Sequence, residues 1–320
     1  MSRRTKKKTT KLQRTTYREQ SKTVPNSLYY LRLVLISNEI LTLSSLLHCI
    51  LILITAPLHS HSHYRFTFQI WNSPYATAAF PEYAEILPNI GDSEAESPSS
   101  KLLIDAAKEL EMWIVGGSIP ERITQDGEEK IYNTCLVLNP EGEVVAKHRK
   151  VHLFDIDVPG GITFFESETL SPGETVSHFT TPFGEIGVGI CYDIRFAEYA
   201  MLLRQKHNCV LLIYPGAFNM TTGPAHWELL QRARAVDNQC FVMMASPARS
   251  EDTAEDSKYP HYTAWGHSTI VSPWADILAT IDEKEGIVVA DLDLSKVGEV
   301  RQGIPIADQK RSDIYKLDEV

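Results

Sequence analysis

The segment that most constrains the fold is a short predicted strand, Glu185–Ile190, near the middle of the chain. Its apolar residues alternate with Gly187 and Gly189, so one face of the strand carries side chains and the opposite face is bare. A bare face allows another backbone or another layer to approach closely. We therefore expect this strand to pack against neighbouring layers.

Predicted strands and helices alternate from about Ile70 to the C-terminus. The first helix, over 99–111, begins within the sequence Ser-Pro-Ser-Ser and places apolar residues from Leu102 to Leu110 on one stripe. Further helices are predicted over 195–207 and 224–237. This order favours helices outside and sheet surfaces inside. Strands are predicted over 112–119, 133–138, 143–148, 185–190, 210–214, 240–245, 268–271, 277–281 and 287–292.

Residues 1–69 differ from the rest of the chain, and we expect one domain over 70–320. The apolar stretch Ile40–Leu58 has His48 as its only ionisable side chain, and its 19 residues are long enough to span a bilayer. The basic flank before it would favour a cytoplasmic N-terminus. Three interpretations stay open: a membrane anchor, an organelle transit peptide, or a disordered or misassigned start outside the domain.

Charge separates the same two parts of the chain. Residues 1–24 carry nine Lys or Arg and one acid, which leaves 22 basic and 40 acidic residues in 25–320, a net charge of −18. A body this acidic repels nucleic acid, and no basic stripe with interleaved aromatic residues interrupts it. We therefore exclude nucleic acid as an expected partner.

Disulfide and metal chemistry have little support in the sequence. Ser-His-Ser-His at 60–63 has no acidic or thiol partner nearby in sequence and is interpreted as a polar linker. The cysteines are odd in number and scattered, with no Cys-x-x-Cys spacing, so neither a disulfide framework nor a metal site is expected. They are Cys49, Cys135, Cys191, Cys209 and Cys240.

Cys191 occupies a position suited to nucleophilic chemistry, between the strand that ends at Ile190 and the helix predicted from Arg195. A thiol there lies near the positive end of a helix and near unpaired backbone N–H groups, which favour the thiolate. The N–H of Tyr192 is free to bind a developing oxyanion. A buried, inert cysteine at a strand end is the competing interpretation, and position alone does not decide between them.

The basic segment at 147–155, Lys-His-Arg-Lys-Val-His-Leu-Phe-Asp, is a second candidate for the site. Its composition favours a solvated turn. The functional interpretation turns one lysine inward, where a buried ammonium would stabilise both a thiolate and a negatively charged substrate oxygen. No histidine follows Cys191 at papain-like spacing, so a Cys–His enzyme is less favoured.

Seven short segments carry a family resemblance: Asn72–Tyr75, Gly116–Glu121, Tyr132–Thr134, Arg149–Asp157, Gly189–Asp193, Tyr214–Asn219 and Trp265–Thr269. In sequence and in order they resemble the omega-amidases of the nitrilase superfamily. The resemblance extends over most of 70–320 without a large gap. Each segment alone is moderately specific, but seven in order make the resemblance strong.

The resemblance implies a fold and a catalytic triad. The fold is an α/β (α+β) four-layer αββα sandwich that usually forms dimers through one layer. The family triad is Glu–Lys–Cys: Lys150 matches the lysine, Cys191 matches the nucleophile, and Glu166 matches a second glutamate that orients the site. The implied substrates are short dicarboxylate monoamides, of the 2-oxoglutaramate and 2-oxosuccinamate class, and no cofactor is needed.

Substrate-binding residues are implied for the same site. A dicarboxylate monoamide requires a cation for its free carboxylate, and Arg195, Arg232 and Arg234 are candidates that the sequence does not rank. A flexible arginine on an exposed helix face is the competing interpretation for each. Tyr75 and Phe218, in two of the matching segments, are further candidates for substrate contact.

One position departs from the family pattern. Omega-amidases have Leu-Pro-Glu before the segment that matches Ile70–Tyr75, and that Glu is the general base, whereas this chain has Thr67-Phe68-Gln69. A glutamine cannot accept a proton at neutral pH, and loss of a general base typically costs about 10²–10⁴ in rate. Glu82 and Glu85 are weaker candidates for a substitute base, because a base must be held within hydrogen-bond reach.

The strand–helix–strand unit that precedes this position in the family is unrecognisable in residues 1–68, so we expect it to be missing or replaced. Its loss would expose sheet edges. The loop at 249–262, rich in Asp, Glu and Ser, is expected to be a solvated insertion without a role.

Two functions of different classes follow. The leading hypothesis is an amide hydrolase that forms a thioester on Cys191, with a small-molecule amide and a second copy of the chain as partners. The alternative, favoured by Gln69, is a catalytically impaired nitrilase-fold protein that acts as a binding or dimerisation module. A cytoplasmic location is expected, with organelle targeting and membrane anchoring as the alternatives.

Overall fold

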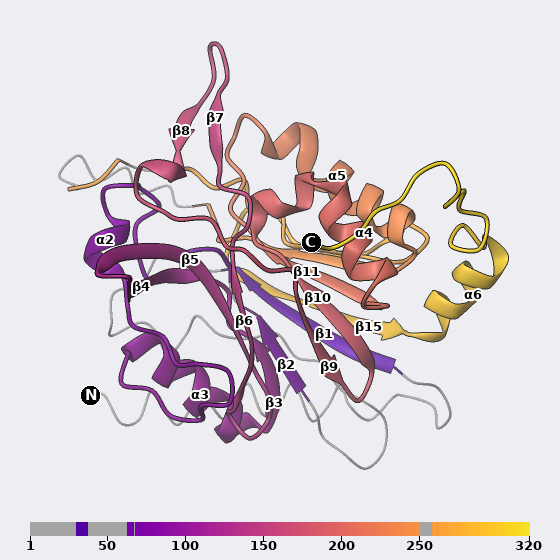
Figure 1. The fold of residues 1–320 in the computed structure, drawn as a ribbon, viewed down its shortest axis with the longest axis horizontal. Coiled ribbons are helices and arrows are strands. Elements are labelled where there is room, and N and C mark those ends of the chain that lie inside the picture. The colour runs from indigo at the N-terminus through magenta and orange to yellow at the C-terminus, as the bar shows by residue number, and fades with distance from the viewer. Residues whose placement is uncertain (1–29, 38–62, 67, 250–257, 261) are drawn as a thin grey trace.

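The computed structural model describes residues 30–37, 63–66, 68–249, 258–260 and 262–320. Within these residues two sheets pack face to face, and helices cover the outer side of each sheet (Figure 1). This four-layer αββα arrangement confirms the expected fold class.

The side chains of each strand in the first sheet alternate between the two faces of the sheet, so one face packs on a helix and the other packs on the second sheet. Ile114 and Leu136 pack on Leu103 and Ala107 of the helix α3 (Pro98–Leu110), while the next residues along the strands, such as Val137, face the second sheet. The helix confirms the prediction over 99–111. The sheet has the order β2 (His63–Phe66), β3 (Met112–Val115), β5 (Glu128–Leu138) and β4 (Ile119–Gln125), with β6 (Val144–Arg149) also paired to β5.

The second sheet has six strands, and its three central strands β10, β11 and β12 run parallel. Its outer face is covered by α4 (Ala197–Gln205) and α5 (Gly223–Asn238). A Cβ at Gly187 would lie 2.8 Å from Leu203 Cδ1 of α4, so the bare strand face allows the close approach expected from the sequence. The order is β14 (Ile277–Thr280), β13 (Thr269–Val271), β12 (Phe241–Ala245), β11 (Leu211–Pro215), β10 (Gly184–Val188) and β9 (Ser177–Thr181).

Two strands stand in place of the unrecognisable N-terminal unit. β1 (Tyr30–Ser37) pairs antiparallel with β15 (Gly286–Asp293), and β2 pairs in parallel with β3. β1 and β2 therefore replace the expected unit as pairing partners, and the edges of β15 and β3 that they cover are not exposed. The apolar stretch at 40–58 and residues 60–62 of the polar linker lie outside the described residues, whereas His63 begins β2. Within the described ranges, no helix is both long and apolar enough to cross a bilayer.

Several short elements complete the fold. The predicted strand over 112–119 is divided into β3 and β4, because the chain turns at Gly117, whose φ is +65°. A hairpin, β7 (Asp155–Asp157) and β8 (Thr163–Phe165), stands out from the body between β6 and the short helix η3 (Glu166–Glu168) (Figure 1). The sequence did not predict this hairpin or the helices α2 (Phe80–Tyr83) and α6 (Ser295–Gly303). The short helix η4 (Cys191–Arg195) follows β10 and leads into α4.

Candidate active site

The turn that carries Cys191 places its thiol at the end of the second sheet. Cys191 is the first residue of η4, and its φ of +46° lies in the left-handed region, which costs a non-glycine residue about 1–2 kcal/mol. Its Sγ accepts a hydrogen bond from the Ala217 N–H at 3.4 Å. Gly189 allows the tight turn, since a Cβ there would lie 2.5 Å from the Tyr214 ring. The predicted junction of strand and helix at the thiol is confirmed.

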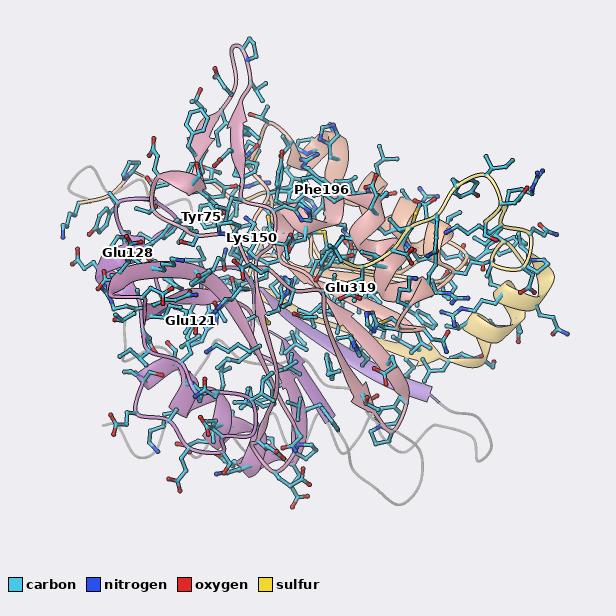
Figure 2. The ribbon with its side chains drawn as sticks, viewed as in Figure 1. Tyr75, Glu121, Glu128, Lys150, Phe196 and Glu319 are labelled. Carbon is cyan, nitrogen blue, oxygen red and sulfur yellow. The ribbon has the colours of Figure 1, made fainter. Side chains whose placement is uncertain are left out.

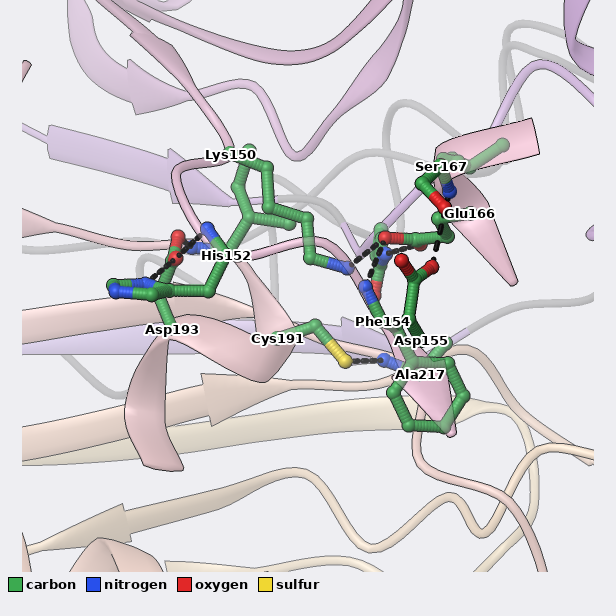
Figure 3. A network of polar contacts seen from close by, with 12 residues as sticks. Lys150, His152, Phe154, Asp155, Glu166, Ser167, Cys191, Asp193 and Ala217 are labelled. Carbon is green, nitrogen blue, oxygen red and sulfur yellow. Dashed lines mark hydrogen bonds and ion pairs between the residues drawn. The ribbon is translucent and has the colours of Figure 1, made fainter. Parts of the chain in front are cut away.

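Lys150 is the lysine of the basic segment that turns inward. It follows β6, and its side chain is fully buried. Its backbone N–H donates to Asn133 O and its carbonyl accepts from the Gly173 N–H, both at 2.8 Å. Figure 2 shows Lys150 and Tyr75 near the end of the first sheet from which the β7–β8 hairpin leaves. In close-up, the side chains of Lys150 and Cys191 point into the same space (Figure 3).

Glu166 is a buried carboxylate that receives four hydrogen bonds, the longest of them from Gln69. Lys150 Nζ donates to Oε2 at 2.6 Å, and the Phe154 N–H donates to the same oxygen at 2.8 Å. The Tyr75 hydroxyl donates to Oε1, also at 2.8 Å. Burial of a carboxylate is tolerated when it is paired and hydrogen-bonded in this way. The β7–β8 hairpin returns the chain to the site, so that Lys150 and Glu166 form one ion pair.

Gln69 lies beside this pair, where the family has its general base. Its side chain is buried, and Nε2 donates to the Tyr75 hydroxyl at 2.9 Å and to Glu166 Oε1 at 3.4 Å. Its Oε1 has no hydrogen-bond partner among the described residues. The position is the one expected from the sequence, but it presents N–H groups to the site and no group that accepts a proton.

Neither of the two weaker candidates for a substitute base reaches the site. Glu85 accepts hydrogen bonds from the backbone N–H and the hydroxyl of Ser99 at the start of α3. Glu82 is exposed and pairs with Lys258. Both carboxylates are engaged elsewhere.

Burial raises the pKa of the Cys191 thiol to about 11, although the Lys150 ammonium and the Ala217 N–H lower it. The sequence correctly indicated groups that favour the thiolate. It did not show that loss of solvent outweighs them. At neutral pH the sulfur therefore carries its proton, and its reaction requires a proton acceptor.

Aromatic side chains enclose the thiol and the ion pair. The rings of Tyr75, Phe164 and Tyr262 pack against one another, with the Tyr75 centroid 5.6 Å from that of Phe164 and 4.5 Å from that of Tyr262. The Tyr262 hydroxyl donates to Ala217 O at 2.6 Å. The loop at 249–262, expected to be a solvated insertion, is therefore packed against the site at Tyr262, a contact that no local pattern marked. Residues 250–257 and 261 of this loop lie outside the described residues.

The structure ranks the three candidate arginines. Arg195 lies over the rings of Tyr192 and Phe218, with Cζ 5.6 and 5.0 Å from their centroids, and it is the one whose charge lowers the pKa of Cys191. Its guanidinium also contacts His226 Nδ1 at 3.2 Å. Tyr192, Arg195 and Phe218 therefore lie together at one end of the site.

The other two arginines have structural partners. Arg234 is buried in α5 and donates to the carbonyls of Ile194 and Arg195, each at 2.8 Å. Arg232 is exposed on the same helix, where it pairs with Glu228. Within the described part of the chain, no group of three His, Cys, Asp or Glu side chains has the arrangement of a metal site.

Residues 42–302 match the family model of the carbon-nitrogen hydrolases. The omega-amidase NIT2 of Bos taurus is 56% identical over 250 residues, which are 78% of this chain and 83% of that protein. The omega-amidase NIT2 of Homo sapiens is 53% identical over the same share of each chain. Identity therefore extends over most of both lengths.

A solved structure shows the same relationship in three dimensions. The crystal structure of Saccharomyces cerevisiae Nit3, a member of branch 10 of the nitrilase superfamily, superposes with a TM-score of 0.71 at 35% sequence identity. The superposition covers 90% of this chain and 100% of that one. The layered sheets are thus those of a known fold.

Proposed function

The chain belongs to the carbon-nitrogen hydrolase family and is omega-amidase-like, and we propose that it hydrolyses short dicarboxylate monoamides through a thioester on Cys191. One observation carries this proposal: the buried thiol lies beside the Lys150–Glu166 ion pair and within the electrostatic reach of Arg195. A nucleophile, an oxyanion-binding cation and a carboxylate-binding cation are three of the groups that this reaction requires, and a proton acceptor is the fourth.

Attack by the thiol forms the acyl-enzyme. The Cys191 sulfur bonds to the amide carbon, and the negative charge that develops on the amide oxygen is held by the Lys150 ammonium and the Tyr192 N–H. The carbon–nitrogen bond then breaks, and the proton lost by the thiol leaves on the nitrogen as part of ammonia. Tyr192 supplies its N–H because the first turn of a helix has no intrahelical acceptor for it.

Water completes the reaction. Its oxygen bonds to the thioester carbon, the carbon–sulfur bond breaks, and the sulfur recovers a proton from the water, so that the dicarboxylic acid is released. The steps are hydrolytic and use side chains together with the backbone N–H of Tyr192.

Arg195 is proposed to bind the substrate carboxylate at the end distant from the amide. Its guanidinium is partly buried over Tyr192 and Phe218, where contact with a carboxylate is strengthened by the low-dielectric surroundings. Tyr75 is proposed to line the opposite wall, since its hydroxyl joins Gln69 to Glu166. A short chain between amide and carboxylate would connect the two ends.

Gln69 sets the rate in this proposal. The thiol with a pKa of about 11 must lose a proton before attack, and the amide at the base position does not accept one. We expect turnover about 10²–10⁴ below that of a site with a carboxylate there. This effect is what favours the alternative, an impaired binding module.

The test is ammonia release from a small dicarboxylate monoamide by the purified chain and by Gln69→Glu. We expect Gln69→Glu to raise the rate by about 10²–10⁴, because it restores a proton acceptor beside the thiol. Adding Cys191→Ala to Gln69→Glu should abolish release and serves as the matched control. Folded proteins that release no ammonia in either form would remove the hydrolase function for this chain.

We further propose that the chain forms a homodimer through the outer face of α5. Leu229 and Val236, seven residues apart on that helix, are 62% and 52% exposed. Trp274 is 62% exposed in the loop where Ala275 O accepts a hydrogen bond from Arg232 of α5. Light scattering should give twice the chain mass, and Leu229→Glu should reduce it to one.

The hydrolase domain is proposed to cover residues 70–320, which contain all seven matching segments. Its proposed partner is a small amide rather than nucleic acid, because residues 25–320 are acidic. A cytoplasmic location is supported by four buried, unpaired cysteines, which suit a reducing compartment. Recovery of the protein in a membrane pellet that resists salt extraction would contradict that location.

A further inference from the structure

A second buried carboxylate, Asp193, lies two residues beyond the thiol and accepts hydrogen bonds from both catalytic segments. Its Oδ2 accepts from the Ile190 N–H at 2.8 Å, which closes the turn that carries Cys191. Its Oδ1 accepts from the backbone N–H of His152 at 2.9 Å and lies 2.7 Å from His152 Nδ1. His148 Nε2 lies 3.1 Å from Oδ2.

The two histidine partners, His148 and His152, lie two residues before and two residues after Lys150 in the sequence. His148 belongs to β6, which ends at Arg149, and His152 lies in the bend that follows Lys150. Each imidazole ring has a further contact that fixes it. His152 stacks on Phe196 with centroids 3.6 Å apart, and His148 Nδ1 lies 3.0 Å from the Ser177 hydroxyl. One carboxylate therefore ties the end of the first sheet to the turn at the end of the second.

Figure 3 shows that Asp193 and His152 lie on one side of Lys150, and Glu166 lies on the other. Burial raises the pKa of the Asp193 carboxyl, but hydrogen bonds from His148 and His152 outweigh it and hold that pKa well below its usual range. Asp193 is thus a fixed negative group that accepts all four contacts.

We propose that Asp193 is a positioning residue of the amidase reaction, which sets the placement of the Lys150 ammonium relative to the Cys191 sulfur. The left-handed backbone at Cys191 is unfavourable by itself, and the Ile190 bond to Asp193 supports it. The same carboxylate holds the backbone on the far side of Lys150. This inference rests on the proposed function only in taking Cys191 as the nucleophile.

Glu121, in β4, provides a matched control, because it pairs with Lys147 and Arg149, the neighbours of His148 in β6. It is equally buried, and it accepts from the Thr134 hydroxyl at 2.7 Å and from Arg149 Nε at 2.8 Å, with Lys147 as a further partner. Its contacts reach residues adjacent to Lys150 but not the turn of Cys191. Loss of either carboxylate removes buried contacts with side chains of β6. Only the contacts of Asp193 also include the segment that carries the thiol.

The test measures alkylation of Cys191 by iodoacetamide between pH 7.5 and 10.5, in the absence of substrate, with the modified peptide identified by mass spectrometry. Asp193→Asn should slow alkylation at pH 8 by about tenfold and move its pH dependence upward, because a displaced Lys150 stabilises the thiolate less. Glu121→Gln should stay within about twofold of the original chain. His152→Phe keeps a ring over Phe196, loses the Nδ1 contact, and should give an intermediate shift.

Alkylation does not depend on turnover, so this outcome is separate from the test of the amidase function. The inference would be overturned if Asp193→Asn and His152→Phe had the alkylation rates and pH profiles of Glu121→Gln and the original chain. It would also be overturned if Glu121→Gln slowed alkylation as much as Asp193→Asn does. If Asp193→Asn does not fold, His152→Phe decides alone, and an unshifted profile in that variant overturns the proposal.

Discussion

Gln69 and Glu166 flank the same Tyr75 hydroxyl, yet they present opposite hydrogen-bonding groups to the site. Glu166 accepts from Lys150, Phe154 and Tyr75 through both of its oxygens. Gln69 donates from Nε2 to Tyr75 and to Glu166, and its Oε1 has no partner among the described residues. One side of the site is a satisfied ion pair and the other is a neutral amide.

The difference shows how charge balance determines what the site does. With Gln69, the buried charges are the Lys150 ammonium and the Glu166 carboxylate, which neutralise each other, and the thiol stays protonated. A glutamate at residue 69 would add a carboxyl 3.4 Å or less from Glu166, and two neighbouring carboxyls raise the pKa of one of them. The raised pKa would make that carboxyl a proton acceptor near neutral pH. The amide keeps the shape of the site and removes this property.

The largest expected effect in this comparison comes from breaking the satisfied side. Lys150→Met leaves Glu166 as a buried charge without its cation, so we expect a loss of about 3–5 kcal/mol in the free energy of unfolding, measured with denaturant. Lys147→Met is the control, because Glu121 keeps Arg149 and Thr134 when Lys147 is lost. Equal losses in the two variants would show that the Lys150–Glu166 pair has no special importance.

The pH dependence of Cys191 alkylation tests the neutral side of the site. With a thiol pKa of about 11, about one Cys191 in 10⁴ is ionised at pH 7, and alkylation by iodoacetamide should rise about tenfold per pH unit up to pH 10. In Gln69→Glu the new carboxylate takes the thiol proton, so we expect alkylation at pH 7 to be about 10²-fold faster and less dependent on pH. A plateau below pH 9 in the original chain would contradict the raised thiol pKa.

The smallest effect concerns the hydroxyl that joins the two sides. Tyr75→Phe removes a donor to Glu166 and an acceptor from Gln69, and we expect unfolding to become easier by about 1–3 kcal/mol. Tyr214→Phe is the matched control, because the Tyr214 ring is buried and its hydroxyl has no hydrogen-bond partner within the described residues. Thermal or denaturant unfolding should separate them, and a loss at Tyr214 as large as that at Tyr75 would argue against the bridge.

Local patterns predicted much of the fold. The helix over 99–111, the hairpin of β5 and β6 and the bare strand at Gly187 all depend on residues close in sequence, and each is confirmed. The strand at 30–37 was not predicted, because its pairing with β15 joins residues 249 to 263 positions apart and no periodicity reports such a pairing. The same holds for Tyr262, whose contact with Tyr75 crosses most of the domain.

By itself the sequence determined which reactive groups the chain has and in what order: a thiol at a strand end, a lysine in a basic segment, and an amide where related enzymes have a carboxylate. Only the tertiary structure decided which of them meet, that Arg195 rather than Arg232 or Arg234 lies near the thiol, and that Asp193 joins the two catalytic segments. It also decided the thiol pKa. The physical reason is that ionisation and contact depend on burial and on distances through space, which arise only when the two sheets pack together.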